Sequence, residues 1–357
     1  MRFVTFRSLD VSASDPGGDR VAVVLESGRL LPLGVLAAAG QGNIAEEIEG
    51  LDLATVIALD PEFGAIRDAI ARTEAGVLEG LAIDPATVRL AAPIPAPGKA
   101  IGVGYNYRDH IREQGLERPE RPVLFSMFGS AVAADGDPIR KPAGTHALDL
   151  EAGLAVVIGR RASRVAAADG LSHVAGYTVA NDVTARDWQG QAKALRPGEK
   201  GDGQWLRAKG SDTFLPLGPV LVTADELGDG RGLRVRSWRT AAAGPDADNA
   251  FLMQDGNTSE LLFGVAELIS IISREVTLNP GDVIVTGTPS GVGVFREPQI
   301  FLEPGDLVRV EVERIGALTS PVVDENGEAP AGSPAAGSMA MRTAGQVPPV
   351  SPAHPPR

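Results

Sequence analysis

Two stretches decide how this chain folds and where its chemistry lies: LDLEAGLAVVIG at residues 148–159 and AGYTVANDVTARD at residues 175–187. Both are apolar and β-prone, as is typical of buried strands. Glu151 and Asp182 lie at their edges, and a buried carboxylate is costly unless a cation or hydrogen bonds compensate it. Two such carboxylates brought together repel one another unless a metal ion neutralises both. The pattern indicates a hard-cation site of oxygen ligands, with Gly153 standing where a further carboxylate would complete it. The alternative is a pair of unrelated strand-end carboxylates.

Composition narrows the class of protein. The chain has 357 residues, of which 43% are hydrophobic and only 4% aromatic, so its core must consist mostly of Val, Leu, Ile and Ala. A net charge of −13 argues against nucleic acid or an anionic membrane as the main partner. The absence of cysteine excludes disulfides, thiolate nucleophiles and iron–sulfur clusters. No apolar run approaches the length of a membrane span, so we expect a cytoplasmic protein.

Four segments divide the chain. Residues 1–92 are expected to form a small N-terminal domain, and residues 93–98 contain three prolines that make a stiff linker. Residues 99–323 are expected to form the main domain. Residues 324–357 are rich in Pro, Ala, Gly and Ser and are predicted to be a disordered tail.

Hydrophobic patterns predict an α+β fold dominated by strands. A hairpin is expected over Arg20–Leu33, and one helix over Ser259–Glu275, with Asn257 and Glu260 as its capping box. The expected strands are Leu154–Ile158, Ala175–Ala180, Val220–Thr223, Leu233–Trp238, Asp282–Thr286 and Leu307–Val312. Residues 192–203 and 241–249 have the composition of insertions.

The segment NYRDHIREQG, residues 106–115, predicts a short helix that ends at Gly115. His110 and Glu113 are three residues apart and therefore share one helix face. A carboxylate beside an imidazole raises its basicity, which suits a general base. The alternative is a solvated ion pair. Gly102 and Gly104 precede this segment, but the third glycine of a phosphate loop is missing, so they indicate a strand-to-loop turn.

Two loops add polar candidates. Lys209 lies in a loop between apolar segments, where a desolvated lysine could bind a carboxylate or polarise a carbonyl; the alternative is an ordinary surface lysine. The stretch VIVTGTPSGVG, residues 283–293, could hold an anionic oxygen through Thr286, Thr288 and backbone N–H groups. The same loop could equally be a tight turn that needs glycine.

Together these blocks resemble the fumarylacetoacetate hydrolase family over about residues 100–323. The resemblance rests on ordered motifs that read IGVGYNYRDH, RPVLFSMFGSAV, LDLEAGLAVVIGR, VAGYTVANDVTARDWQ, GQWLRAKGSDTFLPLGP, QDGNTSELLF, PGDVIVTGTPSGVG and LEPGDLVRVEVERIG. It implies a mixed β-sandwich roll, a homodimer, and a Mg²⁺ or Mn²⁺ site. It also implies a small oxo-acid substrate, which members cleave at a C–C bond, decarboxylate, isomerise or hydrate.

The resemblance also implies roles for individual residues. Glu151 and Asp182 match metal ligands, and Gly153 replaces the second Glu of an E-x-E pair. His110, Glu113 and Lys209 match the catalytic group. Four residues are expected to bind substrate: Gln189, Thr288, Tyr105 and Arg108.

Gly153 leaves three functions open. The first is a metal-dependent hydrolase or lyase with a weakened site, in which Asp149 is a candidate substitute ligand because strand alternation points it to the same face as Glu151. The second is a metal-independent isomerase, cyclase or dehydratase of secondary metabolism that uses the same pocket. The third is a non-catalytic binding protein.

Overall fold

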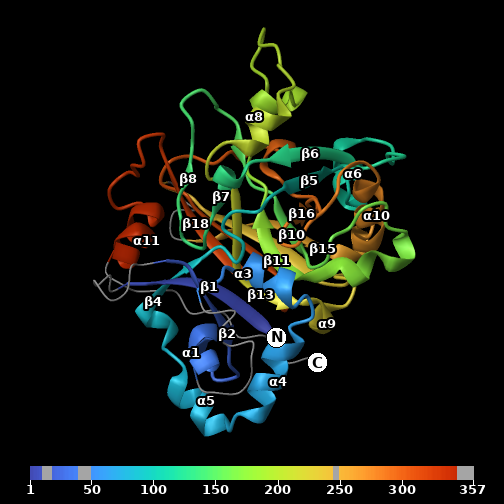
Figure 1. Ribbon diagram of the computed structural model, residues 1–357. Helices are drawn as coiled ribbons and strands as arrows, with labels where there is room; N and C mark the ends of the chain where they lie inside the picture. The colour runs from blue at the N-terminus through green and yellow to red at the C-terminus, as the bar shows by residue number, and fades with distance from the viewer. Residues whose placement is uncertain (10–17, 39–49, 244–248, 344–357) are drawn as a thin grey trace.

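The computed structural model describes residues 1–9, 18–38, 50–243 and 249–343. Its centre is a large mixed sheet (Figure 1). The strands of this sheet are β1 Arg2–Ser8, β2 Arg20–Val24, β3 Leu30–Pro32, β4 Val88–Ala91, β5 Ala100–Gly104, β6 Val123–Met127, β7 Val132–Ala133, β10 Ala152–Ile158, β11 Val174–Asn181, β13 Leu215–Thr223 and β16 Val283–Val285. They run in the order β3-β2-β1-β13-β11-β10-β16-β5-β6, with β4 beside β1 and β7 beside β13.

A second sheet packs against the first. Its strands are β8 Ile139–Arg140, β14 Arg234–Thr240, β15 Phe251–Asn257, β17 Leu307–Val312 and β18 Gly316–Val323, in the order β15-β14-β17-β18-β8. Strands β10, β11 and β13 of the large sheet contact β14, β17 and β18. A small ribbon of β9 Leu148–Asp149 and β12 Thr184–Ala185 lies beside the two sheets. The strand-dominated α+β fold predicted from the sequence is confirmed.

Strand β10 is buried on both faces, which explains its uninterrupted apolar sequence. Leu154, Val156 and Ile158 point into the core between the sheets. Ala155 and Val157 alternate with them and join the core on the opposite face. Truncating a side chain such as Leu154 to alanine typically costs about 2–5 kcal/mol. The strand that leads from Glu151 is therefore a rigid support for the residues at its start.

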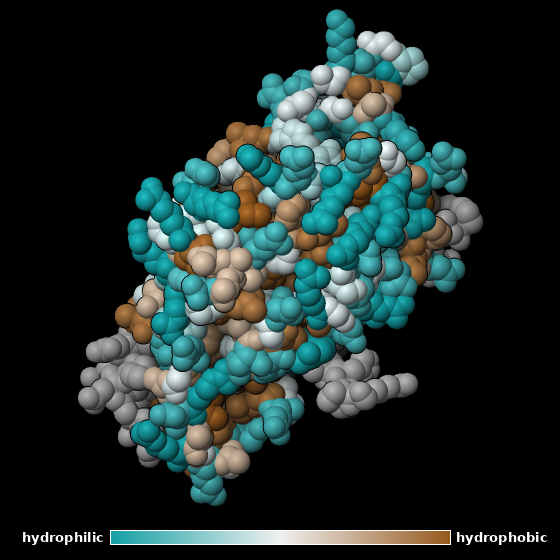
Figure 2. All heavy atoms as spheres, turned by 90° about the vertical axis from the view of Figure 1, so that its right-hand side faces the viewer, coloured by the Kyte–Doolittle hydropathy of each residue, from teal (hydrophilic) through white to brown (hydrophobic). Residues whose placement is uncertain are grey.

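Helices cover the margins of the sheets (Figure 1). They are α1 Leu33–Ala38, α3 Leu53–Leu59, α4 Gly64–Arg72, α5 Ala75–Leu81, α6 Arg108–Gln114, α7 Arg186–Gln189, α8 Trp205–Gly210, α9 Ala224–Leu227, α10 Val265–Glu275 and α11 Pro334–Thr343. Short 3₁₀ turns are η1 Pro85–Thr87, η2 Gly129–Ala131, η3 Ala167–His173, η4 Ala192–Ala194, η5 Thr258–Glu260 and η6 Gly293–Phe295. Across the described ranges, none of the helices has the length and apolar character that a membrane crossing requires. The face in Figure 2 is mainly hydrophilic, with apolar side chains in small groups.

The N-terminal strands extend the large sheet. Strand β1 pairs with β13, with Arg2 opposite Val222 and Phe3 opposite Leu221. The expected hairpin is formed by β2 and β3, with Gly28 in the left-handed region at φ 83°. The division into domains at residues 92 and 99 stays a prediction, but the first segment shares its hydrogen-bond ladder with the second.

Three expectations about local structure were wrong. Lys209, which was expected in a loop, lies in helix α8. The helix predicted from Ser259 begins only at Val265, because Asn257 caps the short turn η5 and its side chain accepts from the backbone N–H of Ser259. The tail predicted to be disordered is folded over residues 324–343: the side chain of Asp324 accepts two backbone N–H groups in a turn, and α11 packs on β18, with Ala335 fully buried. The remainder of the tail and most of the second proposed insertion, residues 244–248, lie outside the described residues.

Candidate active site

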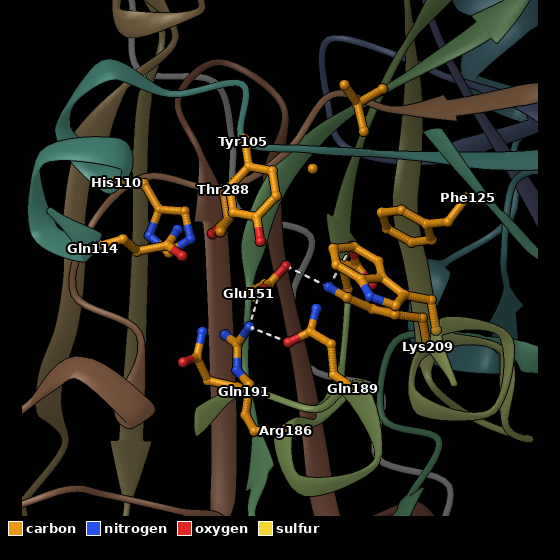
Figure 3. Close-up of a pocket in the computed structure, with 14 residues that line it drawn as sticks. Tyr105, His110, Gln114, Phe125, Glu151, Arg186, Gln189, Gln191, Lys209 and Thr288 are labelled. Carbon is orange, nitrogen blue, oxygen red and sulfur yellow. Dashed lines mark hydrogen bonds and ion pairs between the residues drawn. The ribbon is translucent and has the colours of Figure 1, made fainter. Parts of the chain in front are cut away.

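A pocket opens where β5, β10, β11, α6, α7 and α8 meet (Figure 3). It brings together most of the residues singled out in the sequence. The lining residues are Val103, Gly104, Tyr105, His110, Gln114, Phe125, Glu151, Asp182, Arg186, Gln189, Gln191, Trp205, Lys209 and Thr288. Segments that are up to 185 positions apart in the chain, from 103 to 288, therefore supply one site.

Pairing of β10 with β11 places the two carboxylates side by side. Ala152 lies opposite Asn181 in the register. Just beyond this pair, the backbone N–H of Asp182 donates to the carbonyl of Glu151 at 2.9 Å. The side chain of Asn181 accepts from the backbone N–H of Glu151 at 3.0 Å. The two interrupted apolar runs of the sequence thus meet at their polar ends.

Two cations of the protein neutralise these carboxylates. Lys209 Nζ lies 2.7 Å from Glu151 Oε2 and 2.9 Å from Asp182 Oδ2, and its side chain is only 2% exposed. Arg186 Nη1 lies 2.7 Å from Glu151 Oε1, and its Nε lies 2.9 Å from Asp149 Oδ2. We call these five residues, Asp149, Glu151, Asp182, Arg186 and Lys209, the charged cluster.

The two carboxylates respond differently to this environment. Burial alone would raise the pKa of Glu151, but the charges of Lys209 and Arg186 outweigh it, so the pKa is lowered. Burial raises the pKa of Asp182, and the nearby negative charge of Glu151 adds to that rise, which the positive charge of Lys209 offsets only in part. Glu151 is therefore held as a carboxylate, whereas Asp182 is the member of the cluster that accepts a proton more readily.

The charged cluster leaves two polar atoms without a partner. Asp182 Oδ1 and Arg186 Nη2 are buried, and neither has a hydrogen-bond partner among the described residues. An unsatisfied buried polar group costs about 1–3 kcal/mol. Both residues line the pocket. One acceptor and one donor are thus available to a bound molecule.

Helix α6 carries the predicted imidazole–carboxylate pair. His110 Nδ1 lies 2.9 Å from Glu113 Oε2, and Glu113 Oε1 accepts from the backbone N–H of Gly291 at 2.8 Å. Gly115 ends the helix in the left-handed region, as expected. A neutral imidazole that donates its Nδ1–H to Glu113 has Nε2 as a proton acceptor for the pocket. Phe295 contacts the other side of the ring edge-on, with ring centroids 5.8 Å apart. Glu113 supports His110 from behind and is absent from the pocket lining.

Three aromatic rings form a further side of the pocket, and we call Tyr105, Phe125 and Trp205 the aromatic wall. The ring centroid of Trp205 lies 5.4 Å from that of Phe125 and 6.3 Å from that of Tyr105. Gly102 makes this wall possible, because a Cβ there would lie 2.1 Å from the Phe125 ring. Gly102 and Gly104 lie in β5, directly before the turn that leads to α6, as the sequence indicated. The absence of a side chain at Gly102 leaves space for the Phe125 ring.

Gly153 is also explained by a close approach. A Cβ at this position would lie 2.5 Å from the carbonyl oxygen of Gly287, which belongs to the loop after β16. Gly287 has φ 102°, a conformation that favours glycine. Backbone therefore occupies the place where the side chain of a second Glu would begin.

The donor set does not fit a divalent cation held by the protein. Of the four oxygens of Glu151 and Asp182, three already face Lys209 or Arg186, and only Asp182 Oδ1 is free. In the described part of the chain, no group of three or more His, Cys, Asp or Glu side chains could hold a metal ion. Mg²⁺ and Mn²⁺ require several oxygen ligands. In this structure the ammonium of Lys209 supplies the positive charge between the two carboxylates.

Asp149 does not act as the substitute ligand that strand alternation suggested. Its Oδ1 accepts the backbone N–H of Leu150 and Gly293, and its Oδ2 accepts that of Val294 as well as Arg186 Nε. It is 1% exposed and does not line the pocket. Asp149 instead positions Arg186.

The predicted substrate-binding residues are distributed unevenly. Tyr105, Gln189 and Thr288 line the pocket. The Thr288 hydroxyl donates to the carbonyl of Ala152 and accepts from Gln254 Nε2, so it already has two partners. Arg108 lies outside the pocket lining, and its guanidinium donates to the carbonyl of Ser259. The expected role of Arg108 stays a prediction without support from its position.

Sequence reasoning missed five polar or aromatic lining residues, which are Gln114, Phe125, Arg186, Gln191 and Trp205. Arg186 was not singled out, although it lies only four residues after Asp182 in the stretch VTARD. Gln114 lies one helical turn after His110, a spacing that could have indicated a shared face. Nothing in the local sequence marks Gln191 or Trp205, because they reach the pocket from the two ends of the segment 192–203.

The comparisons with known proteins agree with this architecture. Residues 99–323 match the model of the fumarylacetoacetate (FAA) hydrolase C-terminal family, so the chain belongs to that family. It is 45% identical over 236 residues to a mitochondrial oxaloacetate tautomerase of Xenopus laevis, an alignment that covers 66% of this chain and 69% of that protein.

Solved structures are also similar. The fumarylacetoacetate hydrolase of Exiguobacterium antarcticum is 31% identical with a TM-score of 0.68, covering 90% of this chain and 99% of that one. The 5-carboxymethyl-2-hydroxymuconate delta-isomerase of Mycobacterium smegmatis is 41% identical with a TM-score of 0.56, covering 68% of this chain and 83% of that one. The family is one of enzymes, and its members with similar sequences carry names of both proton-transfer and hydrolytic reactions.

Proposed function

We propose that this protein is a tautomerase or isomerase that moves a proton between carbon and oxygen in a 2-oxo acid, without a divalent metal. One observation carries the proposal: Lys209, held between Glu151 and Asp182, lines the same pocket as the imidazole of His110. A cation beside an imidazole whose Nε2 is free can stabilise an enolate while a proton is moved. Relatives named as an oxaloacetate tautomerase and a delta-isomerase support this reaction class.

Each group would have a separate task. The unpartnered Nη2 of Arg186 would bind the substrate carboxylate. His110 Nε2 would take the proton from C3, while Glu113 fixes the tautomer and orientation of the ring. Lys209 would stabilise the negative charge that develops on the C2 oxygen. Return of the proton to that oxygen gives the enol, so atoms and charge balance without water or a second substrate.

C–C bond hydrolysis is a second candidate, supported by the likeness to the fumarylacetoacetate hydrolase structure. It requires the same His110 to activate a water molecule for attack on a distal carbonyl. Decarboxylation of a 2-oxo diacid is the remaining alternative. Hydrolysis and decarboxylation could both take place in this pocket, so their products distinguish them from tautomerisation. A homodimer and a cytoplasmic location stay predictions.

Product analysis separates these candidates. The purified protein would be incubated with oxaloacetate and with an acylpyruvate, each with Mg²⁺, with Mn²⁺ and with EDTA. We expect faster keto–enol exchange in all three conditions, followed by NMR and by the ultraviolet absorbance of the enol. Release of pyruvate with a free acid from the acylpyruvate, or of CO₂ from oxaloacetate, would favour the other reactions. Tight binding with no product would indicate a binding protein.

A further inference from the structure

The pocket contains no surplus positive charge for a substrate with two carboxylates. Its lining carboxylates, lysine and arginine are Glu151, Asp182, Arg186 and Lys209, two of each sign, and His110 adds a positive charge only when it is protonated. Arg186 also pairs with Asp149 from behind. The charge of the whole chain, −13, adds a repulsive background for dianions. A single carboxylate can be bound by the free Arg186 Nη2, but the described lining offers no further arginine, and its one lysine is already paired with Glu151 and Asp182.

Beyond the charged cluster, the lining is neutral. Gln114 and Gln191 supply amides, and the aromatic wall supplies ring faces and edges. Figure 3 shows Gln114 next to His110 and Gln191 next to Arg186, whereas Phe125 lies on the side of Lys209. The face of an aromatic ring carries partial negative charge, so it favours flat unsaturated groups and disfavours a carboxylate.

The pocket contains about 400 Å³ of space between its lining side chains, part of which is open to solvent. The Phe125 ring lies so close to the backbone at Gly102 that a Cβ there would be 2.1 Å from it, and Lys209 Nζ lies 5.2 Å from the ring centroid. A planar group that extends from a carbonyl held by Lys209 would meet this wall with its face or edge.

We propose that the preferred substrate is a 2-oxo acid with one carboxylate and a flat, unsaturated, uncharged tail that packs on Tyr105, Phe125 and Trp205. This inference rests on the proposed tautomerase function and adds the substrate class. It differs from the dicarboxylic acid in the name of the oxaloacetate tautomerase relative. The reaction is the same: His110 Nε2 accepts the C3 proton, the C2–C3 double bond forms, and the C2 oxygen gains a proton.

The test compares two acids that differ in their tails, phenylpyruvate and oxaloacetate. We expect kcat/KM for tautomerisation of phenylpyruvate to exceed that for oxaloacetate by at least about 10-fold. Oxaloacetate would lack the aromatic contact with the wall and would bury an unpaired second carboxylate, and each of these changes affinity on that scale. Trp205→Leu should reduce this ratio, and Trp205→Phe, which keeps an aromatic face, should retain most of it. Gln114→Arg should raise kcat/KM for oxaloacetate by supplying a cation.

Controls separate a local effect from a loss of folding. Trp238→Leu removes an indole from β14, outside the pocket, where it stacks with Arg236 and Arg309, and should leave the ratio unchanged. Circular dichroism melts of each variant would identify an unfolded one. A wild-type preference for oxaloacetate, or a ratio that Trp205→Leu does not change, overturns the inference.

Failure of the proposed function is recognised separately. If neither acid is tautomerised, isothermal titration calorimetry still ranks the binding of the two acids by the wild-type protein. Tighter binding of phenylpyruvate would then support the tail specificity while the reaction class is rejected. Tighter binding of oxaloacetate would overturn the inference whatever reaction the protein catalyses.

Discussion

The charged cluster and the aromatic wall line one pocket, but they are built in different ways. Members of the charged cluster are almost completely buried, and nearly every polar atom has a partner within it or on the backbone. The rings of the aromatic wall are only partly buried and are held by contact with one another and with β5. The charged cluster fixes where charge can develop, and the aromatic wall can adapt to the remainder of a substrate.

The charged cluster shows how buried carboxylates are compensated where Gly153 carries no side chain. Its three carboxylates face two protein cations, and backbone N–H groups donate further hydrogen bonds to Asp149. Buried charges are tolerated when they are paired and hydrogen-bonded. Lys209 therefore serves as both a structural counter-ion and the group available to an enolate.

The largest expected effect concerns proton transfer. His110→Ala should reduce kcat/KM about 10²–10⁴-fold, because a positioned general base contributes on that scale. Binding of a substrate analogue, measured by calorimetry, should be nearly retained, since the charged cluster is intact. His173→Ala is the matched control, because His173 lies on the surface beside the carbonyl of Arg160. Undiminished turnover in His110→Ala would rule out its assignment.

A change within the charged cluster should affect both activity and folding. Lys209→Met should lower kcat about 10²–10³-fold by removing the group that stabilises the enolate oxygen. It should also destabilise the protein by up to about 3–5 kcal/mol, because Asp182 loses its main counter-charge and must take up a proton to stay buried. Chemical denaturation and steady-state kinetics would measure the two effects, and Lys200→Met provides the exposed control. Normal stability of Lys209→Met would contradict the counter-ion role.

Metal removal tests whether the ammonium of Lys209 takes the place of a divalent metal ion. We expect EDTA to leave tautomerisation unchanged within about 2-fold and Mn²⁺ titrations followed by electron paramagnetic resonance to detect no tight site. Gly153→Glu should lose about 1–3 kcal/mol of stability through the clash with the Gly287 carbonyl. Gly153→Ala introduces the same Cβ without the carboxylate and is the matched control. Tight Mn²⁺ binding by the wild-type protein would show that the charged cluster rearranges to hold a metal.

The smallest effect is expected outside both sides of the pocket. Arg108→Ala should change kcat/KM by less than about 3-fold, because its guanidinium contacts the Ser259 carbonyl at the surface. Its stability should also change little, since surface substitutions usually alter stability by no more than about 0.5 kcal/mol. A larger decrease in kcat/KM that comes from a higher KM alone would show that Arg108 moves to the pocket mouth when substrate binds. Gln189→Ala offers a comparison with a residue that does line the pocket.

Local patterns in the sequence predicted what depends on neighbouring residues. The apolar run from Leu154 to Ile158 predicted β10, and the spacing of His110 and Glu113 predicted their contact on α6. The same reasoning failed for the helix at Ser259, where a cap residue was assigned to the wrong turn. It also failed for residues 334–343 of the predicted tail, because composition alone does not reveal that α11 packs on β18.

The sequence by itself therefore determined the strand-rich fold, the family, and which polar residues interrupt buried segments. Only the tertiary structure decided how those residues pair. Lys209 meets Glu151 across 58 positions of sequence, and Gly153 meets the carbonyl of Gly287 across a sheet. Periodicity reports the environment of a residue along its own strand or helix, whereas charge pairing and close approach depend on distances between elements, which are set by packing of the whole core.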